Sequence, residues 1–421
     1  MRKNRVTWEA SRPMATAVPP RSRALRAHET LVGRFDPSVI ETPRRGARIR
    51  LALGDPAAAN DGGSSARDAV GSDVLIENDW ADLQPIEPAR SPDALLTADE
   101  PTWIRIAEDI RAAMDAFRQG RLSVRRNLSL GVGLLAATTG SKDPGRLRFA
   151  RVRTPIGYLS TMEAGAGDPI VLLHGLGGTK ASFLPSMNWL ADSYRVIAVD
   201  LPGFGDSVKP IGARYDARYF AQSVIKLLDR LGIEHAHVVG NSMGGRVALE
   251  LGMFAPERVD KLVLLAPSLA WLRGRPWAPF LRLLRPELGL LQAAPRPVVE
   301  GIVRRIVPGA SDGWSAAGVD EFLRAYLDPR GRAAFYAAAR QIYLEEPHGD
   351  DGFWTRLRSI QGDSLFVWGL EDNLVPISFQ RHVREALPLA RHVELDCGHV
   401  PQVEAPRETH AAIKQFLRSA T

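Results

Sequence analysis

The sequence contains a single cysteine, Cys397, among 421 residues, so it cannot form an intramolecular disulfide. It also lacks long hydrophobic runs. The mildly apolar stretch Leu128–Ala137 is far shorter than the roughly 20 residues needed to cross a bilayer. The N-terminal region has no apolar segment of the kind found in secretory signals. We therefore expect a cytoplasmic protein, with weak association at a membrane surface as the alternative.

Lysine is scarce, although the formal net charge is +6 and the pI is about 9.6. The positive charge comes from arginines spread along the chain, and no basic strip is interleaved with aromatic residues. This pattern argues against nucleic-acid binding. The composition, 45% hydrophobic and 24% charged, is that of a soluble globular protein whose length allows a large buried core.

Charge is distributed unevenly over the first hundred residues. Residues 1–50 are rich in arginine and proline, whereas residues 51–100 are acidic, with only Arg67 and Arg90 as basic residues. A chain of this composition buries too little apolar surface to offset the entropy lost on ordering. The sequence therefore predicts that residues 1–100 form a largely disordered extension.

Residues 101–146 are predicted to form a helical N-terminal segment. An apolar stripe recurs at intervals of three and four residues, which favours a helix over 101–119; its members are Trp103, Ile106, Ile110, Met114 and Phe117. The favoured interpretation is a helix packed on the larger domain of the same chain, which begins near residue 147. The alternative is a helix lying at a membrane surface or docking a partner.

From residue 147 onwards, β-prone runs alternate with helix-prone stretches. The expected strands are Ile156–Glu163, Ile170–Leu173, Arg195–Val199, His237–Val239, Leu262–Leu265, Leu365–Trp368 and His392–Leu395, and the clearest helices are Tyr219–Leu231 and Ser378–Leu387. This alternation predicts an α/β fold with a mostly parallel central sheet and helices on both faces. The core is assigned to residues 147–267 and 359–421, and residues 268–358 interrupt it as a helical, apolar insertion.

The most informative motif is Gly240-Asn241-Ser242-Met243-Gly244-Gly245, which lies between a strand and a helix. It has the G-x-S-x-G pattern of a nucleophile elbow, a turn so tight that small residues must flank the serine. A serine nucleophile needs a histidine base, and the histidine needs a carboxylate. Asp372 and His399 each follow a predicted strand, in the expected order after Ser242.

A glycine-rich loop, His174-Gly175-Leu176-Gly177-Gly178, follows another predicted strand. Backbone N–H groups in such a loop can bind a developing oxyanion. The predicted oxyanion hole consists of the Leu176 and Met243 amides. We expect His174 to order this loop through hydrogen bonds, and Asp206 to brace a neighbouring loop.

Five segments together resemble the α/β-hydrolase fold family in order and spacing: HGLGG, DLPGFGDS, GNSMGG, WGLEDNLVP and CGHVPQVEAP. The resemblance covers roughly residues 147–419 and implies that Ser242 is the nucleophile, Asp372 the acid and His399 the base. It also implies that residues 268–358 form a cap over the nucleophile, and the apolar residues of this cap favour a hydrophobic substrate.

The expected activity is hydrolysis of a carboxylic ester through an acyl-enzyme, with a small hydrophobic ester or acyl compound as the binding partner and no metal or organic cofactor. Three alternatives remain. The GNSMGG and CGH segments are similar to those of meta-cleavage-product hydrolases, which cleave carbon–carbon bonds, although Val400 stands where those enzymes usually have an aromatic residue. The others are a cofactor-free haloperoxidase or perhydrolase, and a binding module without turnover.

Overall fold

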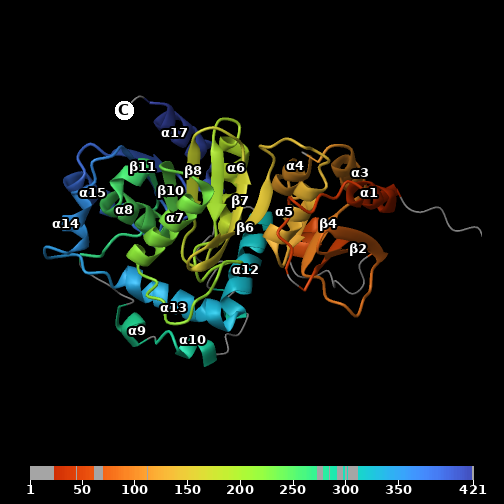
Figure 1. Cartoon of the computed structure of the whole chain (residues 1–421), viewed down its shortest axis with the longest axis horizontal. Coiled ribbons are helices and arrows are strands. Elements are labelled where there is room, and N and C mark those ends of the chain that lie inside the picture. The colour runs from red at the N-terminus through yellow and green to blue at the C-terminus, as the bar shows by residue number, and fades with distance from the viewer. Residues whose placement is uncertain are drawn as a thin grey trace, which may run out of the picture.

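The computed structural model describes residues 23–419, except residues 44, 61–69, 111, 273–277, 284, 292–296, 299–300 and 302–311. The described residues contain two β-sheets, a five-stranded sheet near the N-terminus and an eight-stranded sheet in the remainder of the chain (Figure 1). We call residues 23–137 the N-terminal unit. None of the described helices has the length and apolar character needed to cross a membrane.

The eight-stranded sheet has the order β13-β12-β11-β10-β8-β9-β7-β6. Its strands are β6 (Arg148–Thr154), β7 (Gly157–Ala164), β8 (Pro169–Leu173), β9 (Arg195–Val199), β10 (Ala236–Asn241), β11 (Val259–Leu265), β12 (Ser364–Gly369) and β13 (Arg391–Leu395). Strands β8 to β13 pair in parallel, whereas β6 and β7 are antiparallel. The predicted mostly parallel sheet is confirmed, with β6 as an additional strand.

Helices cover both faces of this sheet because successive strand residues point to opposite sides. Ile170 and Leu172 of β8 belong to one apolar cluster, together with residues of α6 (Leu184–Leu190) and α17 (Pro406–Arg418). Val171 and Leu173 belong to the other, with α7 (Ala217–Leu231), α8 (Met243–Phe254) and α15 (Phe379–Ala386). Shorter elements, η1 (Lys180–Phe183), η2 (Pro256–Arg258) and α16 (Pro401–Glu404), lie in the connections.

Residues 268–358, here called the inserted segment, lie between β11 and β12. Their described helices are α9 (Ala278–Leu283), α10 (Leu288–Leu291), α12 (Asp312–Leu327), α13 (Pro329–Tyr343) and α14 (Phe353–Leu357). In Figure 1, α9, α10 and α13 gather at one end of the sheet, and α12 runs from this group towards the N-terminal unit. The described part of the inserted segment is mostly helical, and its role as a cap over the nucleophile stays a prediction.

The N-terminal unit contains a sheet of order β3-β2-β1-β4-β5. Its elements are α1 (Arg23–Val32), β1 (Ala47–Leu53), α2 (Pro56–Asn60), β2 (Val70–Glu77), β3 (Trp80–Pro85), β4 (Ala94–Ala98), α3 (Glu100–Glu108), α4 (Ala112–Arg118), β5 (Leu122–Arg125) and α5 (Leu128–Ala137). The prediction of a disordered extension over residues 1–100 is therefore wrong for its described part. Residues 1–22 and 61–69 lie outside the described residues.

Arginines of the basic half of this region pair with carboxylates of the acidic half. The charged composition therefore did not indicate that the region folds. Arg50 of β1 lies directly across from Asp73 of β2, and both side chains are fully buried. The Arg50 Nε and Nη2 groups donate to the Asp73 carboxylate at 2.7 and 3.0 Å, and Arg48 adds a third bond. Neighbouring apolar residues such as Ile49 and Val74 then complete a buried core.

The predicted helix over 101–119 is divided into α3 and α4, because the backbone is extended at Asp109. Trp103 is fully buried within the N-terminal unit, and its indole N–H donates to the Ala52 carbonyl at 3.0 Å. Trp103 and Ile106 of the stripe are therefore buried within the N-terminal unit, whereas Phe117 at its end packs against Trp314 of the inserted segment. The domain boundary predicted at residue 100 is also wrong, since β4 continues through the N-cap Asp99 into α3.

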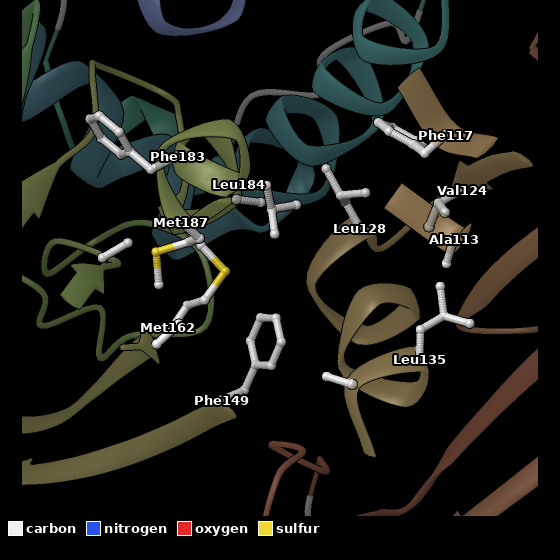
Figure 2. Close-up of a cluster of buried hydrophobic side chains, with 14 of the residues drawn as sticks. Ala113, Phe117, Val124, Leu128, Leu135, Phe149, Met162, Phe183, Leu184 and Met187 are labelled. Carbon is white, nitrogen blue, oxygen red and sulfur yellow. The ribbon is translucent and has the colours of Figure 1, made fainter. Parts of the chain in front are cut away.

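One apolar cluster continues from the N-terminal unit into the eight-stranded sheet (Figure 2). On one side it contains Ala113, Phe117, Val124 and Leu135, and on the other Phe149, Met162, Phe183 and Met187. Figure 2 shows Leu128, at the start of α5, between these two groups. Because a continuous buried cluster excludes water, the two sheets are packed into one body.

Candidate active site

Ser242 lies in the tight turn between β10 and α8. Its backbone angles are φ 53° and ψ −117°, a conformation that L-residues rarely adopt and that indicates local strain. The flanking glycines are required by close backbone approaches. A Cβ on Gly240 would lie 2.2 Å from the Gly244 carbonyl oxygen, and one on Gly244 would lie 1.9 Å from the Leu173 carbonyl oxygen. The turn thus has the geometry expected of a nucleophile elbow.

We expect Gly244→Ala to destabilise the protein by about 3 kcal/mol or more, because the added methyl group meets backbone atoms of β8 that cannot rotate away. The measurement is the midpoint of urea unfolding, together with soluble yield. Gly362→Ala is the matched control, since a Cβ there has no neighbour within 4 Å. Equal stability of the two variants would contradict the tight packing of this turn.

His399 and Asp372 are joined by a hydrogen bond of 2.8 Å between Nδ1 and Oδ2. The Asp372 side chain is fully buried, and that of His399 is 8% exposed. The other oxygen of Asp372 accepts from the backbone N–H groups of Leu374 and Val375. A carboxylate held in this way fixes the imidazole ring and leaves its Nε2 atom as the nitrogen that can accept a proton.

Two polar residues that the sequence analysis did not single out shape these loops. The side-chain amide of Asn241 donates to the carbonyl oxygens of Leu265 and His399, both at 3.0 Å, and so ties the serine turn to the histidine loop. The Glu404 carboxylate accepts from the N–H groups of Gly398 and Val400. Asn241 directly precedes Ser242, and Glu404 lies shortly after His399. These positions are the sequence signals that could have identified the two residues.

The Ser242 hydroxyl lies 3.4 Å from the hydroxyl of Ser268, which follows β11. Both Ser242 and His399 are described, and no hydrogen bond joins them; they do line the same cavity. Catalytic hydrogen bonds are often long or poorly aligned before substrate binds. Ser268 could have been found by inspecting the residues after each strand end.

The loop after β8 approaches the serine closely, since a Cβ on Gly175 would lie 3.2 Å from the Ser242 Cβ. Leu176 and Met243 also line the cavity, and Met243 begins α8, so its N–H lies among the helix N–H groups without a partner in the helix. His174 bonds the Gly175 carbonyl through Nδ1 and accepts from the Leu201 N–H through Nε2. Burial lowers the pKa of His174 and so favours the neutral ring. The two hydrogen bonds of this ring hold the loop, as the sequence analysis expects.

The cavity that contains Ser242 and His399 has a volume of about 620 Å³. Its wall is mostly apolar and includes Trp271, Trp314, Phe322 and Phe335 from the inserted segment. Among the described lining residues there is no arginine or lysine, and Glu321 is the one carboxylate. Such a site favours the apolar part of an uncharged ligand.

The contacts of Cys397 and Asp206 indicate a structural role for each residue. Cys397 is buried, and burial raises the pKa of its thiol to about 12, so it is a poor nucleophile. Asp206 binds Lys180 and Arg324 at 3.3 and 2.6 Å. Although burial acts to raise its pKa, these two cations hold it well below its usual value. In the described parts of the chain, no group of His, Cys, Asp and Glu side chains is arranged to hold a metal ion.

Comparisons with known proteins identify the family to which this fold belongs. The family model described as alpha/beta hydrolase fold matches residues 168–301. The chain belongs to the α/β-hydrolase fold family. It is 34% identical over 272 residues to the 2-hydroxy-6-oxononadienedioate/2-hydroxy-6-oxononatrienedioate hydrolase of Paraburkholderia phymatum, in an alignment that covers 61% of this chain and 89% of that protein.

Two further relatives show how broad the family is. The chain is 34% identical over 261 residues to the dihydrolipoyllysine-residue acetyltransferase component of the acetoin cleaving system of Pseudomonas putida. That alignment covers 60% of this chain and 64% of the relative, so the chain spans slightly less than two thirds of its length. A solved structure of a membrane phospholipase A, a bacterial virulence factor, matches with a TM-score of 0.54 and 28% identity, covering 64% of this chain and 86% of that one.

Proposed function

We propose that this protein is a serine hydrolase that cleaves a carboxylic ester of an uncharged, hydrophobic substrate through an acyl-enzyme. The observation that supports it most is the buried His399–Asp372 hydrogen bond of 2.8 Å beside a cavity that also contains Ser242 on its strained turn. A serine hydroxyl becomes a useful nucleophile only when such a histidine and carboxylate accompany it.

In the proposed mechanism, His399 Nε2 takes the Ser242 proton as the hydroxyl oxygen attacks the ester carbonyl carbon. The backbone N–H groups of Leu176 and Met243 stabilise the oxyanion, each contributing about 3–4 kcal/mol to the transition state. His399 then protonates the departing alkoxide. Water, deprotonated by the same nitrogen, attacks the acyl-enzyme and releases the acid, while Asp372 stabilises the imidazolium in both steps.

The preference for an uncharged substrate rests on the cavity wall. The names of the Paraburkholderia relative's substrates end in dioate, which denotes two carboxylates. A dianion leaves water only where cations replace its hydration, and the described lining residues of this chain include no arginine or lysine. An apolar acyl or alkyl group gains free energy from the same wall.

Carbon–carbon bond hydrolysis is the second candidate, because the 34% identity to the Paraburkholderia hydrolase extends over 89% of that protein. The same serine, histidine and oxyanion groups could serve that reaction. Val400 lines the cavity next to His399, so the surroundings of the base are apolar in either case.

The test compares a series of p-nitrophenyl esters of increasing acyl length with a vinylogous 1,5-diketone carrying two carboxylates, on the same preparation. We expect kcat/KM to be higher for the apolar esters than for the diketone, whose cleavage is followed by loss of colour. Labelling of the protein by a fluorophosphonate, detected at Ser242 by peptide mass spectrometry, is the accompanying measurement. Faster cleavage of the diketone would establish the second candidate, and no turnover and no labelling would reject both.

A further inference from the structure

The wall of the catalytic cavity is not formed by the eight-stranded sheet and the inserted segment alone. Leu128, the first residue of α5, lines the same cavity as Ser242 and His399, although it belongs to the N-terminal unit. Its side chain is 3% exposed, so it is packed and not merely near the opening. Residues more than a hundred positions apart in the chain therefore share one binding surface.

A second contact joins the N-terminal unit to the part of that wall formed by α12. Phe117 of α4 packs edge-on against Trp314 of α12, with ring centroids 4.8 Å apart. Trp314 itself lines the cavity. The N-terminal unit thus supports one lining residue from behind and supplies another directly.

Two buried carboxylates on α12 hold the turn between β5 and α5. Asp320 accepts from Arg125 Nε at 2.8 Å and from the Arg126 backbone N–H at 2.7 Å. Glu321 accepts from the Leu128 N–H at 2.7 Å, at the start of α5, where a negative charge is favoured. Asp320 and Glu321 are 5% and 4% exposed.

Glu321 also reaches the catalytic loops. Its second carboxylate oxygen accepts from the Thr179 hydroxyl at 3.0 Å, and Thr179 lies two residues after Gly177 in the loop that carries Leu176. Arg324 on the next turn of α12 completes the pairing with Glu321. One carboxylate therefore connects α5, α12 and the proposed oxyanion loop. Separating these elements would remove two of the hydrogen bonds that the buried Glu321 carboxylate accepts, which is unfavourable.

We propose that the N-terminal unit determines which acyl groups the active site accepts: Leu128 limits the space for the acyl chain, and the Arg125–Asp320 contact positions α12 across the cavity. This inference rests on the proposed esterase function and adds to it a specificity-determining residue and a positioning residue. The substrate class is an uncharged acyl ester whose chain contacts Leu128.

The test measures the ratio of kcat/KM for p-nitrophenyl laurate to that for p-nitrophenyl butyrate. A ratio does not depend on how much of a variant is folded. We expect Leu128→Ala to raise the ratio about tenfold and Leu128→Phe to lower it about tenfold, since one or a few methylene groups in an apolar pocket change kcat/KM by that order. Leu135→Ala is the matched control, because it removes the same atoms from α5 at a buried position outside the cavity.

The positioning role of Arg125 has a separate readout. We expect Arg125→Gln to raise KM for the laurate ester more than for the butyrate ester, with a smaller change in kcat, because α12 loses a fixed position without loss of any reacting group. Arg148→Gln is the control, since Arg148 pairs with Glu163 away from the cavity. Equal changes in KM for both esters would reject the positioning role.

Failure of this inference and failure of the proposed function give different results. If the wild-type protein hydrolyses neither ester in a manner that depends on Ser242, the proposed function is wrong. If hydrolysis depends on Ser242 and the laurate-to-butyrate ratio is the same in Leu128→Ala, Leu128→Phe and the wild type, the esterase function stands and the role of the N-terminal unit is rejected.

Discussion

Ser242→Ala is expected to lower kcat for p-nitrophenyl esters by roughly 10⁴- to 10⁶-fold, the loss typical of removing the nucleophile of such a site. The substitution removes only the oxygen that attacks the carbonyl. The fold should be unchanged, because the turn is fixed by backbone contacts of Gly240 and Gly244 and by the Ser242 N–H, which donates to the Leu265 carbonyl at 3.0 Å.

The assay is steady-state hydrolysis with circular dichroism to verify folding. Ser359→Ala is the matched control, because that hydroxyl is far along the chain and bonds only to the Arg356 carbonyl among the described residues. A residual rate in Ser242→Ala is expected from the oxyanion donors and from binding alone. Ester hydrolysis at the wild-type rate in Ser242→Ala would show that another group carries the reaction.

Asp73→Asn is expected to destabilise the protein by about 3–5 kcal/mol, the cost of leaving a buried charge without its partner. Arg50 is fully buried, and two of its guanidinium nitrogens donate to the Asp73 carboxylate. The neutral amide of asparagine keeps the volume but removes the charge. The effect falls on the N-terminal unit, and it is measured as the shift in the urea unfolding midpoint.

A paired substitution separates the charge effect from packing. Arg50→Met combined with Asp73→Leu replaces the ion pair with apolar groups and is expected to recover much of the lost stability. Asp82→Asn is the control on the neighbouring strand, where the carboxylate is exposed and accepts from the Gln84 side-chain amide. Equal stability of Asp73→Asn and the wild type would show that the Arg50–Asp73 pair contributes little to holding the sheet together.

The α/β core could be predicted from the sequence because its signals are local. Strand β9 has the predicted bounds, and the other predicted strands differ at their ends by a few residues. The candidate residues Ser242, Asp372 and His399 were found for the same reason, since each follows a strand in a characteristic short motif. That they act as a catalytic triad stays a prediction until the variants are measured.

The N-terminal unit could not be predicted in the same way because its stability is not local. Arg50 and Asp73 each look like solvent-exposed charges until β1 and β2 pair, and only then do they neutralise each other in the interior. The contribution of Leu128 to the cavity has the same origin. It depends on the contact between α12 and the β5–α5 turn, and no periodicity in the sequence predicts that contact.

The anchoring of α12 has a consequence for how a substrate reaches Ser242. On one side Asp320 and Glu321 bind the N-terminal unit, and on the other Arg324 binds Asp206 beside the eight-stranded sheet. Moving α12 outward breaks both sets of ion pairs at once. Opening at α9, where Leu281 lines the cavity and Leu283 is largely exposed, breaks none of them. Among the described elements of the cavity wall, α12 is therefore an anchored side, tied both to the N-terminal unit and to the loop of Asp206.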